Sequence, residues 1–278
     1  RTRFCTDLAV SIACPGGPAG QDGHYEIRVP NYQLVGGRVQ DPITGLAWER
    51  NAPVTEITHA AAIIYCGSLV LDGLDDWRVP SYLELVSIAD FGATGPGFPS
   101  TAFPGIPQNS NYWTTTDRAT SAAQAYVMNT NYPTTSFGTK TDASGHLVRC
   151  VRGIQYVGAL VVAGGSITDG RTGLVWQSGT APTTMTWVNA LAYCEALVLE
   201  AQSDWRLPNG KELLSIIDPT LVSPSISPLF TTRPATSFWS SSALQNFPAT
   251  AYAIHFDYGA SDNIGTNLTQ LRSVRCVR

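Results

Sequence analysis

The sequence predicts an α+β protein made of two tandem domains, each closed by its own disulfide. Three observations support this fold class: a long internal repeat, the same order of predicted elements in both copies, and cysteines that divide evenly between the copies. The chain of 278 residues is long enough for two domains, and a single hydrophobic core rarely grows beyond about 250–300 residues.

The internal repeat has a period far too long for a solenoid. Residues 41–48 recur as residues 169–176, an offset of 128, and residues 148–152 recur as residues 274–278, an offset of 126. Each copy, at about 120 residues, is large enough for a core of its own. The predicted organisation is a disulfide-closed leader at 1–32, a first domain at 33–154 and a second domain at 155–278.

Each copy begins with a strand that leads into an Asp-x-x-Thr-Gly-Leu turn. Gly45 and Gly173 supply the positive φ that such a tight turn requires. A first helix follows Thr58 or Thr186, which we predict to be N-caps. In the second copy, apolar residues recur at i, i+3, i+4, i+7 and i+10 from Trp187, which places them on one face of this helix.

A Trp-Arg-x-Pro motif occurs at 77–80 and again at 205–208. A second helix follows its proline. Ser-x-x-Glu at 81–84 and Asn-x-x-Glu at 209–212 both have the spacing of a capping box. Long stretches rich in Gly, Pro and Ser follow at 91–111 and 219–237, and they show no periodicity. Short alternating strands then close each copy. This order of elements is typical of the α+β class, with a small antiparallel sheet.

The repeat also predicts how the cysteines pair. Each copy has one cysteine on its first helix and one on its final strand, so these two should form a bridge, and the remaining pair should close a short loop in the leader. The predicted bridges are Cys66–Cys150, Cys194–Cys276 and Cys5–Cys14. Buried free thiols are the alternative, and zinc is disfavoured because there is no Cys-x-x-Cys pair or Cys/His cluster. Disulfides indicate an extracellular or cell-surface location, with the periplasm as an alternative.

Charge and hydropathy argue against binding of nucleic acid and against a membrane-spanning helix. The net charge is −4, and only 14% of residues are charged, so the basic excess typical of nucleic-acid binders is missing. No apolar stretch approaches the roughly 18 residues of a membrane-spanning helix. We therefore expect no nucleic acid and no transmembrane segment.

Several motifs, present in the same order in both copies, carry a resemblance to a bacterial family. They are Thr-Gly-Leu-x-Trp, Tyr-Cys, Asp-Trp-Arg-[Leu/Val]-Pro, [Phe/Tyr]-Trp-[Ser/Thr]-[Ser/Thr] and Val-Arg-Cys-Val-Arg, with Lys-Glu-Leu at 211–213. They resemble the C-terminal domain of the Legionella collagen-like adhesin, over about residues 33–153 and 160–278. The resemblance implies a C-type lectin-like fold, a secreted or surface-anchored protein and, as in that adhesin, binding of sulfated glycans. The sequence departs from the adhesin in having no collagen-like Gly-X-Y tract.

Catalytic machinery is not evident in the sequence. Trp77 and Trp205 are expected in the core, and the arginines that follow them are expected to pair with a carboxylate or loop carbonyls. The four histidines lie at non-equivalent positions, and no nucleophile-elbow, zinc-protease or phosphate-loop motif is found. We therefore predict that the protein is not an enzyme and that it has no catalytic residues.

Binding residues are expected in the long loops and at the strand ends, where amides lie beside aromatic residues. The candidates are Asn109, Asn111, Tyr112, Asn129 and Tyr132 in the first domain, and Phe238, Asn246, His255, Asp257, Tyr258 and Asn263 in the second. Calcium is an alternative at Asp257, Asp262 and Asn263 because hard oxygen ligands gather there, but no EF-hand spacing supports it. We expect no cofactor.

Two functions follow as hypotheses. The first is a non-enzymatic extracellular adhesion protein that recognises glycan or matrix polymer through its long loops. The alternative is a structural subunit of a cell-surface fibre or appendage, whose partners are copies of itself. Lysine is nearly absent, with only Lys140 and Lys211. This favours self-association, because few surface charges then oppose contact between copies. The leader could also add a strand to a neighbour's sheet.

Overall fold

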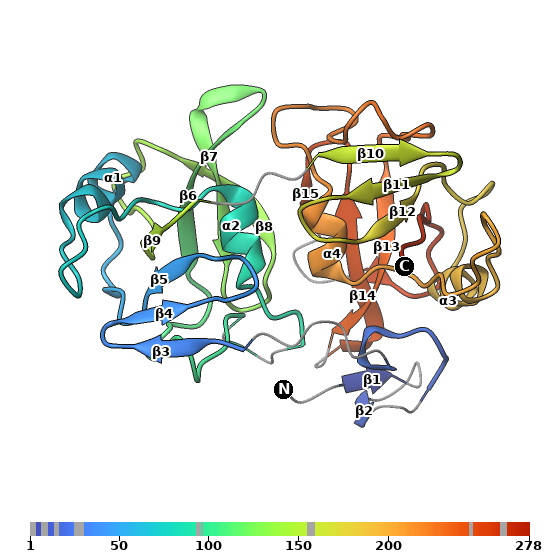
Figure 1. The fold of residues 1–278 in the computed structure, drawn as a ribbon, viewed down its shortest axis with the longest axis horizontal. Helices are drawn as coiled ribbons and strands as arrows, with labels where there is room; N and C mark the ends of the chain where they lie inside the picture. Colours follow the sequence, from blue (N-terminus) through green and yellow to red (C-terminus); the bar gives the residue numbers. More distant parts are fainter. Residues whose placement is uncertain are drawn as a thin grey trace. The chain divides into compact units, whose positions relative to one another are not determined.

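Both copies of the repeat fold into the same succession of elements (Figure 1). The computed structural model describes residues 4–6, 11–13, 17–24, 31–92, 95, 97–154, 159–244, 247–261 and 266–278. The chain divides into two units, one of residues 28–156 and the other of residues 1–27 together with 157–278. Residues 1–27 of the predicted leader therefore belong to the unit of the second domain.

The first domain has two antiparallel sheets, ordered β3-β4-β5-β9 and β6-β7-β8, and two short helices. Its elements are β3 (Gln33–Val35), β4 (Arg38–Gln40), β5 (Ala47–Glu49), α1 (His59–Ser68), α2 (Tyr82–Ser87), β6 (Asn111–Arg118), β7 (Ser121–Asn129), β8 (Thr135–Thr139) and β9 (Val151–Arg152). The long segment between α2 and β6 contains no helix or strand among its described residues.

The second domain repeats this plan, with sheets ordered β10-β11-β12 and β13-β14-β15, and β16 also pairs with β14. Its elements are β10 (Leu160–Ala163), β11 (Ser166–Asp169), β12 (Val175–Gln177), α3 (Trp187–Glu195), α4 (Gly210–Ser215), β13 (Ser237–Leu244), β14 (Phe247–His255), β15 (Ala260–Ser261) and β16 (Thr266–Asn267). The leader contributes β1 (Phe4–Thr6), β2 (Ser11–Ala13) and a 3₁₀ turn (Asp22–His24).

The predicted turn and helix signals are confirmed. The Asp41 carboxylate accepts hydrogen bonds from the Ile43 amide (2.9 Å) and the Thr44 hydroxyl (2.8 Å), and Gly45 has a φ of +73°. The Thr58 hydroxyl caps α1 by accepting from the Ala61 amide. Both predicted capping boxes form, at the start of α2 and of α4. Thr186 occupies the N-cap position of α3, but its hydroxyl makes no capping hydrogen bond.

The last residues of each copy, 148–152 and 274–278, form its closing segment. This segment lies between the first sheet of the domain and its Trp-Arg motif, residues 77–78 or 205–206. In the first domain Val151 pairs with Trp48 of β5 and forms a bridge with Arg78. In the second domain Val277 bridges Trp176 and Arg206 in the same way. The closing segment is thus bonded on both edges, although it comes last in each copy.

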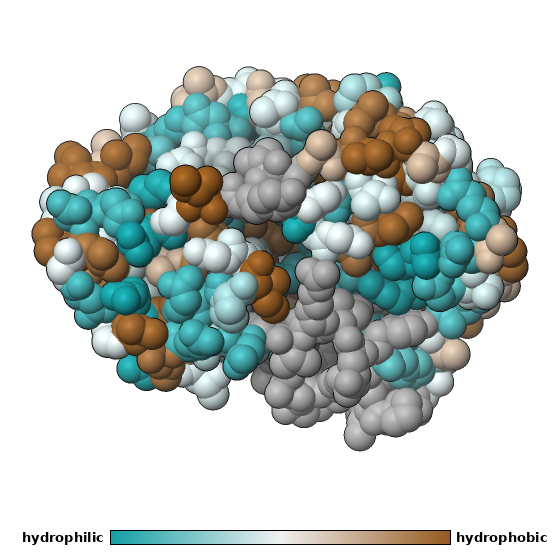
Figure 2. Space-filling model, in the orientation of Figure 1, coloured by the Kyte–Doolittle hydropathy of each residue, from teal (hydrophilic) through white to brown (hydrophobic). Residues whose placement is uncertain are grey.

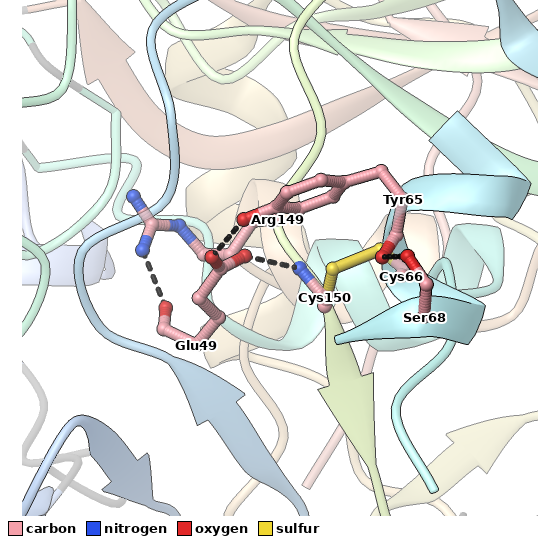
Figure 3. The surroundings of a disulfide bond; sticks show 6 residues. All are labelled: Glu49, Tyr65, Cys66, Ser68, Arg149 and Cys150. Carbon is pink, nitrogen blue, oxygen red and sulfur yellow. Dashed lines mark hydrogen bonds between the residues drawn. A yellow bond between two sulfur atoms is a disulfide. The ribbon is translucent and has the colours of Figure 1, made fainter. Parts of the chain in front are cut away.

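Two predicted disulfides fix this arrangement, Cys66–Cys150 and Cys194–Cys276, each with a Cα–Cα distance of 5.5 Å. Figure 3 shows the first of them, where the Glu49 carboxylate accepts hydrogen bonds from the Tyr65 hydroxyl (2.6 Å) and the Cys150 amide (3.2 Å). Burial, and next the neighbouring Glu49 carboxylate, raise the pKa of Tyr65 well above its ordinary value. The predicted Cys5–Cys14 bridge lies outside the described residues.

Each domain has its own hydrophobic core around its disulfide. Trp113, with the Cys66–Cys150 bridge, lies at the centre of the first, and Trp239, with Cys194–Cys276, lies at the centre of the second. The tryptophans of the two Trp-Arg motifs are buried in these cores, as predicted.

Removing one bridge should destabilise only its own domain. The Cys66–Cys150 bridge spans 84 residues of sequence, and closing a loop of that length stabilises by about 4–5 kcal/mol in the chain-entropy model. The double variant Cys66→Ala/Cys150→Ala should therefore lose about that much in the urea unfolding transition of the first domain. The double variant Cys194→Ala/Cys276→Ala is the matched control, which should shift the other transition instead. Equal shifts of both transitions in either variant would contradict two independent cores.

Candidate functional site

The arginine and glutamate of each Trp-Arg motif bind each other. Arg206 makes two hydrogen bonds of 2.7 Å to Glu212, and Arg78 makes the same two-point contact with Glu84 at 2.7 and 2.5 Å. The same glutamates also close the capping boxes. Two-point pairing of this kind fixes geometry strongly, so each pair joins its Trp-Arg motif to the second helix.

A second pair of arginines is buried under the long loops. Arg149 donates to the carbonyls of Glu49 and Arg50 at 2.6 and 2.7 Å, and Arg275 donates to those of Gln177 and Ser178 at 2.8 and 2.7 Å. Burial lowers the pKa of both guanidinium groups.

Aromatic rings complete these two sites. The Arg149 guanidinium lies 4.9 Å from the centroid of Phe103, and that of Arg275 lies 4.3 Å from Phe230. Both rings belong to the long irregular segments. Each buried arginine therefore ties its loop to the closing segment, at a range where a cation–π contact contributes to stability.

The remaining arginine of each closing segment is on the surface but is also paired. Arg152 bonds Asp76 at 2.6 and 3.1 Å, and Arg278 bonds Asp204 at 2.7 Å. The hydrogen bond from each arginine is the main cause that lowers the pKa of its aspartate partner. To bind a sulfated glycan, these two arginines would have to leave their aspartate partners.

Polar groups gather at one end of the β6–β7 hairpin in the first domain. The Asn129 side-chain amide donates to Asn111 (3.1 Å) and Asn109 (3.4 Å), while its oxygen accepts from the backbone of Asn131 (2.8 Å). Asn109 is exposed and has a φ of +53°, and Asn111 and Asn129 are half-buried. We call Asn109, Asn111 and Asn129 the amide cluster. Tyr132, also half-buried, follows three residues after Asn129.

The second domain carries a different set at the equivalent end of the β13–β14 hairpin. His255 Nδ1 lies 2.8 Å from the Ser237 hydroxyl and 3.5 Å from the Asp257 carboxylate. The His255 ring stacks on Tyr258, with centroids 4.9 Å apart and an angle of 18° between the planes. Tyr258 is 36% exposed. We call Ser237, His255, Asp257 and Tyr258 the histidine cluster.

The Ser-His-Asp composition of this cluster does not have the geometry of a catalytic triad. The Ser237 hydroxyl and the Asp257 carboxylate both approach the same nitrogen, Nδ1 of His255. A triad needs the serine and the carboxylate on opposite ring nitrogens, so that the imidazole can take the serine proton while the acid orients it. This arrangement therefore lacks the triad geometry, and it can present hydrogen-bonding groups to a ligand.

The two clusters occupy equivalent positions, since Asn111, Asn129 and Tyr132 match Ser237, His255 and Tyr258 at the offset of 126. Both hairpins place these residues directly opposite each other, with Asn111 paired to Asn129 and Ser237 to His255. The chemistry presented is nevertheless different, carboxamides in one domain and imidazole, carboxylate and phenol in the other.

Other predicted site residues lie elsewhere. Tyr112 and Phe238 are only 1% and 2% exposed, because they point into the core beneath the clusters, where Tyr112 packs edge-on against Phe98 and Phe238 against Phe256. The predicted residues Asn246 and Asn263, and Asp262 of the calcium alternative, lie outside the described part of the chain. Within that part, no group of three His, Cys, Asp or Glu residues is placed to hold a metal ion.

His59 is a core residue, as its position opposite Trp187 in the repeat predicts. Its Nε2 lies 2.9 Å from the Thr114 carbonyl, and the indole nitrogen of Trp187 donates to the equivalent carbonyl of Ser240 at 2.7 Å. His59 also packs edge-on against Trp113.

Sequence reasoning missed Ser237 and Asn131. Both follow from the repeat itself, because Ser237 is the counterpart of Asn111, and Asn131 is the counterpart of Asp257. Aligning the two copies position by position would have identified them.

Fold and site together define a class: a tandem repeat of α+β domains, each closed by one disulfide and carrying a polar cluster at the end of its second-sheet hairpin. Residues 37–152 and residues 165–278 each match the model of the Lcl C-terminal domain family. The chain belongs to this family and contains two tandem copies of its domain. No curated protein matches the chain. Among the residues described, no helix is both long and apolar enough to cross a membrane.

The two Arg–Glu pairs should differ in their contribution to stability. Glu212→Ala leaves Arg206 unpaired with its side chain only 11% exposed, and an uncompensated buried charge costs about 3–5 kcal/mol. Glu84→Ala should cost less, because the Arg78 side chain is 41% exposed and water can solvate it. Urea unfolding of each variant measures both values, with Glu212→Gln and Glu84→Gln as controls that keep the shape. A larger loss for Glu84→Ala would contradict this order.

Proposed function

We propose that this protein is a non-enzymatic extracellular binding protein that adheres to glycan or matrix polymer through the hairpin ends of its two domains. The observation that carries the proposal is the placement of the amide and histidine clusters at equivalent hairpin ends. Both present partly exposed hydrogen-bonding groups; the histidine cluster includes the stacked Tyr258, and Tyr132 follows the amide cluster three residues after Asn129, a mixture that suits sugar hydroxyls and the flat faces of sugar rings. Small-molecule sites typically use a few such convergent polar groups.

The fold proposed for each domain is C-type lectin-like. Its support is the disulfide from the first helix to the closing strand, and the long irregular segment that leads into the second sheet. In such an arrangement the scaffold is fixed by its covalent and buried contacts, and loops and strand ends remain available for recognition. The disulfides also support an oxidising location, at the cell surface or in the medium, since reducing compartments disfavour them.

Several features favour binding over catalysis. The serine and carboxylate of the histidine cluster share one imidazole nitrogen, and the arginines of the Trp-Arg motifs are engaged in structural pairs. Because the two clusters differ in chemistry, we propose that the domains recognise different groups, or different parts of one polymer, and do not simply repeat one contact. Binding by both would then combine two weak contacts into a stronger one.

A glycan array with neutral and sulfated ligands tests this function. The wild-type chain should bind at least one class, and His255→Ala or Asn129→Ala should weaken binding to its own ligand about tenfold, because two hydrogen bonds contribute about 0.5–1.5 kcal/mol each. Arg152→Gln serves as the matched control, since Arg152 is half-buried, like Asn129, but lies outside both clusters. Absence of binding by the wild type would overturn the proposal, as would equal binding by all variants.

A second proposed function is that of a structural subunit in a surface fibre. It is favoured by helix α1, on which Ile63 and Ile64 are 50% and 71% exposed, and Figure 2 shows hydrophobic residues at the surface over this helix. Electron microscopy of concentrated native protein measures this directly, because a fibre subunit should form ordered polymers and an isolated adhesin should not.

A further inference from the structure

The leader is seated on the second domain. The Ser242 hydroxyl of β13 donates to the Asp22 carboxylate at 3.1 Å while accepting from the Gly210 amide at 3.1 Å. Gly20 has a φ of +86°, and a Cβ there would lie 3.2 Å from Glu195 and 3.4 Å from Leu191, both on α3. The leader therefore contacts α3 through Gly20 and β13 through Asp22.

Repeat-equivalent residues show what this contact covers. Leu191 on α3 is 1% exposed, whereas its counterpart on α1, Ile63, is 50% exposed. The same contrast runs along the hairpin strand. Ser241, Ser242 and Leu244 are buried, while their counterparts Thr115, Thr116 and Arg118 are exposed, half-buried and half-buried.

The rest of α1 and α3 behaves alike in the two copies. Ala62 and Ala190 are both fully buried, and Val70 and Val198, just beyond the helices, are both 68% exposed. The change from exposed to buried thus lies at the patch that the leader covers in the second domain. We call its counterpart, formed by Ile63, Thr115, Thr116 and Arg118, the open patch.

The open patch keeps the chemistry that holds the leader. The Thr116 hydroxyl accepts from the Tyr82 amide at 2.9 Å, as the Ser242 hydroxyl accepts from the Gly210 amide, so Thr116 has the hydroxyl with which Ser242 donates to Asp22. Arg118 stands where the second domain has Leu244, and its guanidinium is held by the Gln124 side chain (2.8 Å) and over the Phe137 ring. Ile63 supplies the apolar surface that Leu191 supplies in the second domain.

One leader therefore has two matching surfaces. The Gly-Gln-Asp-Gly sequence of the leader occurs once in the printed chain, at residues 20–23, and that copy is seated on the second domain. We propose that the open patch of the first domain binds the leader of a second copy of this chain, which leaves the seat on its own second domain to do so. The contact goes beyond glycan recognition and rests on the structural function, because it joins the leader of one copy to the first domain of the next.

Sedimentation of the full chain over a wide concentration range tests this contact. The wild type should associate progressively, and Ile63→Glu, which places a charged side chain where Gly20 of the leader would pack, should lower the association constant at least tenfold. Val70→Glu is the matched control, an exposed valine outside the patch, and should associate as the wild type does. An oxidised peptide of residues 1–24 should inhibit wild-type association, and the same peptide with Asp22→Asn should inhibit less.

Two results would overturn the proposal. A wild type that stays monomeric at all concentrations would remove both the contact and the fibre function. Association that is equal in the wild type and Ile63→Glu would retain self-association but place it on another surface. Neither result bears on the glycan array, whose variants lie in the two clusters.

Discussion

The closing segment of each domain carries the contacts on which the rest of the structure depends. In the first domain Cys150 bonds it to helix α1, Val151 pairs it with the first sheet and with the Trp-Arg motif, and Arg149 beside them reaches under the long loop to Phe103. Covalent, backbone and cation–π contacts thus converge on three consecutive residues. The long loop has no helix or strand among its described residues, and Arg149 is one of the contacts that hold it against the core, together with Phe98 on Tyr112.

Because these contacts lie in the closing segment, the residues at the hairpin ends can differ between the two domains. Amide groups in the first domain and a stacked His255–Tyr258 pair in the second stand on the same backbone positions, above aromatic residues that stay buried in both. Partly exposed side chains at such positions contribute little to folding, because surface substitutions usually change stability by less than about 0.5 kcal/mol. The two copies can therefore share a scaffold and present different chemistry to a ligand.

The repeat made much of this predictable from sequence. It gave the domain count, both long disulfides and the capping boxes, because each rests on residue types whose spacing is fixed by covalent or helical geometry. It did not predict that Tyr112 and Phe238 are buried, since an aromatic beside a polar residue on a strand can face either way, and the burial of the neighbouring strand decides it. Nor did it predict the seat of the leader on α3, which depends on contacts more than 150 residues apart in sequence.

Exchange of the hairpin-end residues tests most directly whether recognition resides in the two clusters. The triple variant Asn111→Ser, Asn129→His, Asn131→Asp gives the first domain the histidine cluster, because Tyr132 already matches Tyr258. In a chain whose own second-domain site is disabled by His255→Ala, this exchange should restore the glycan-array profile of the second domain. A profile that is not restored, in a variant that unfolds like the wild type, would contradict the account and place recognition elsewhere on the domain.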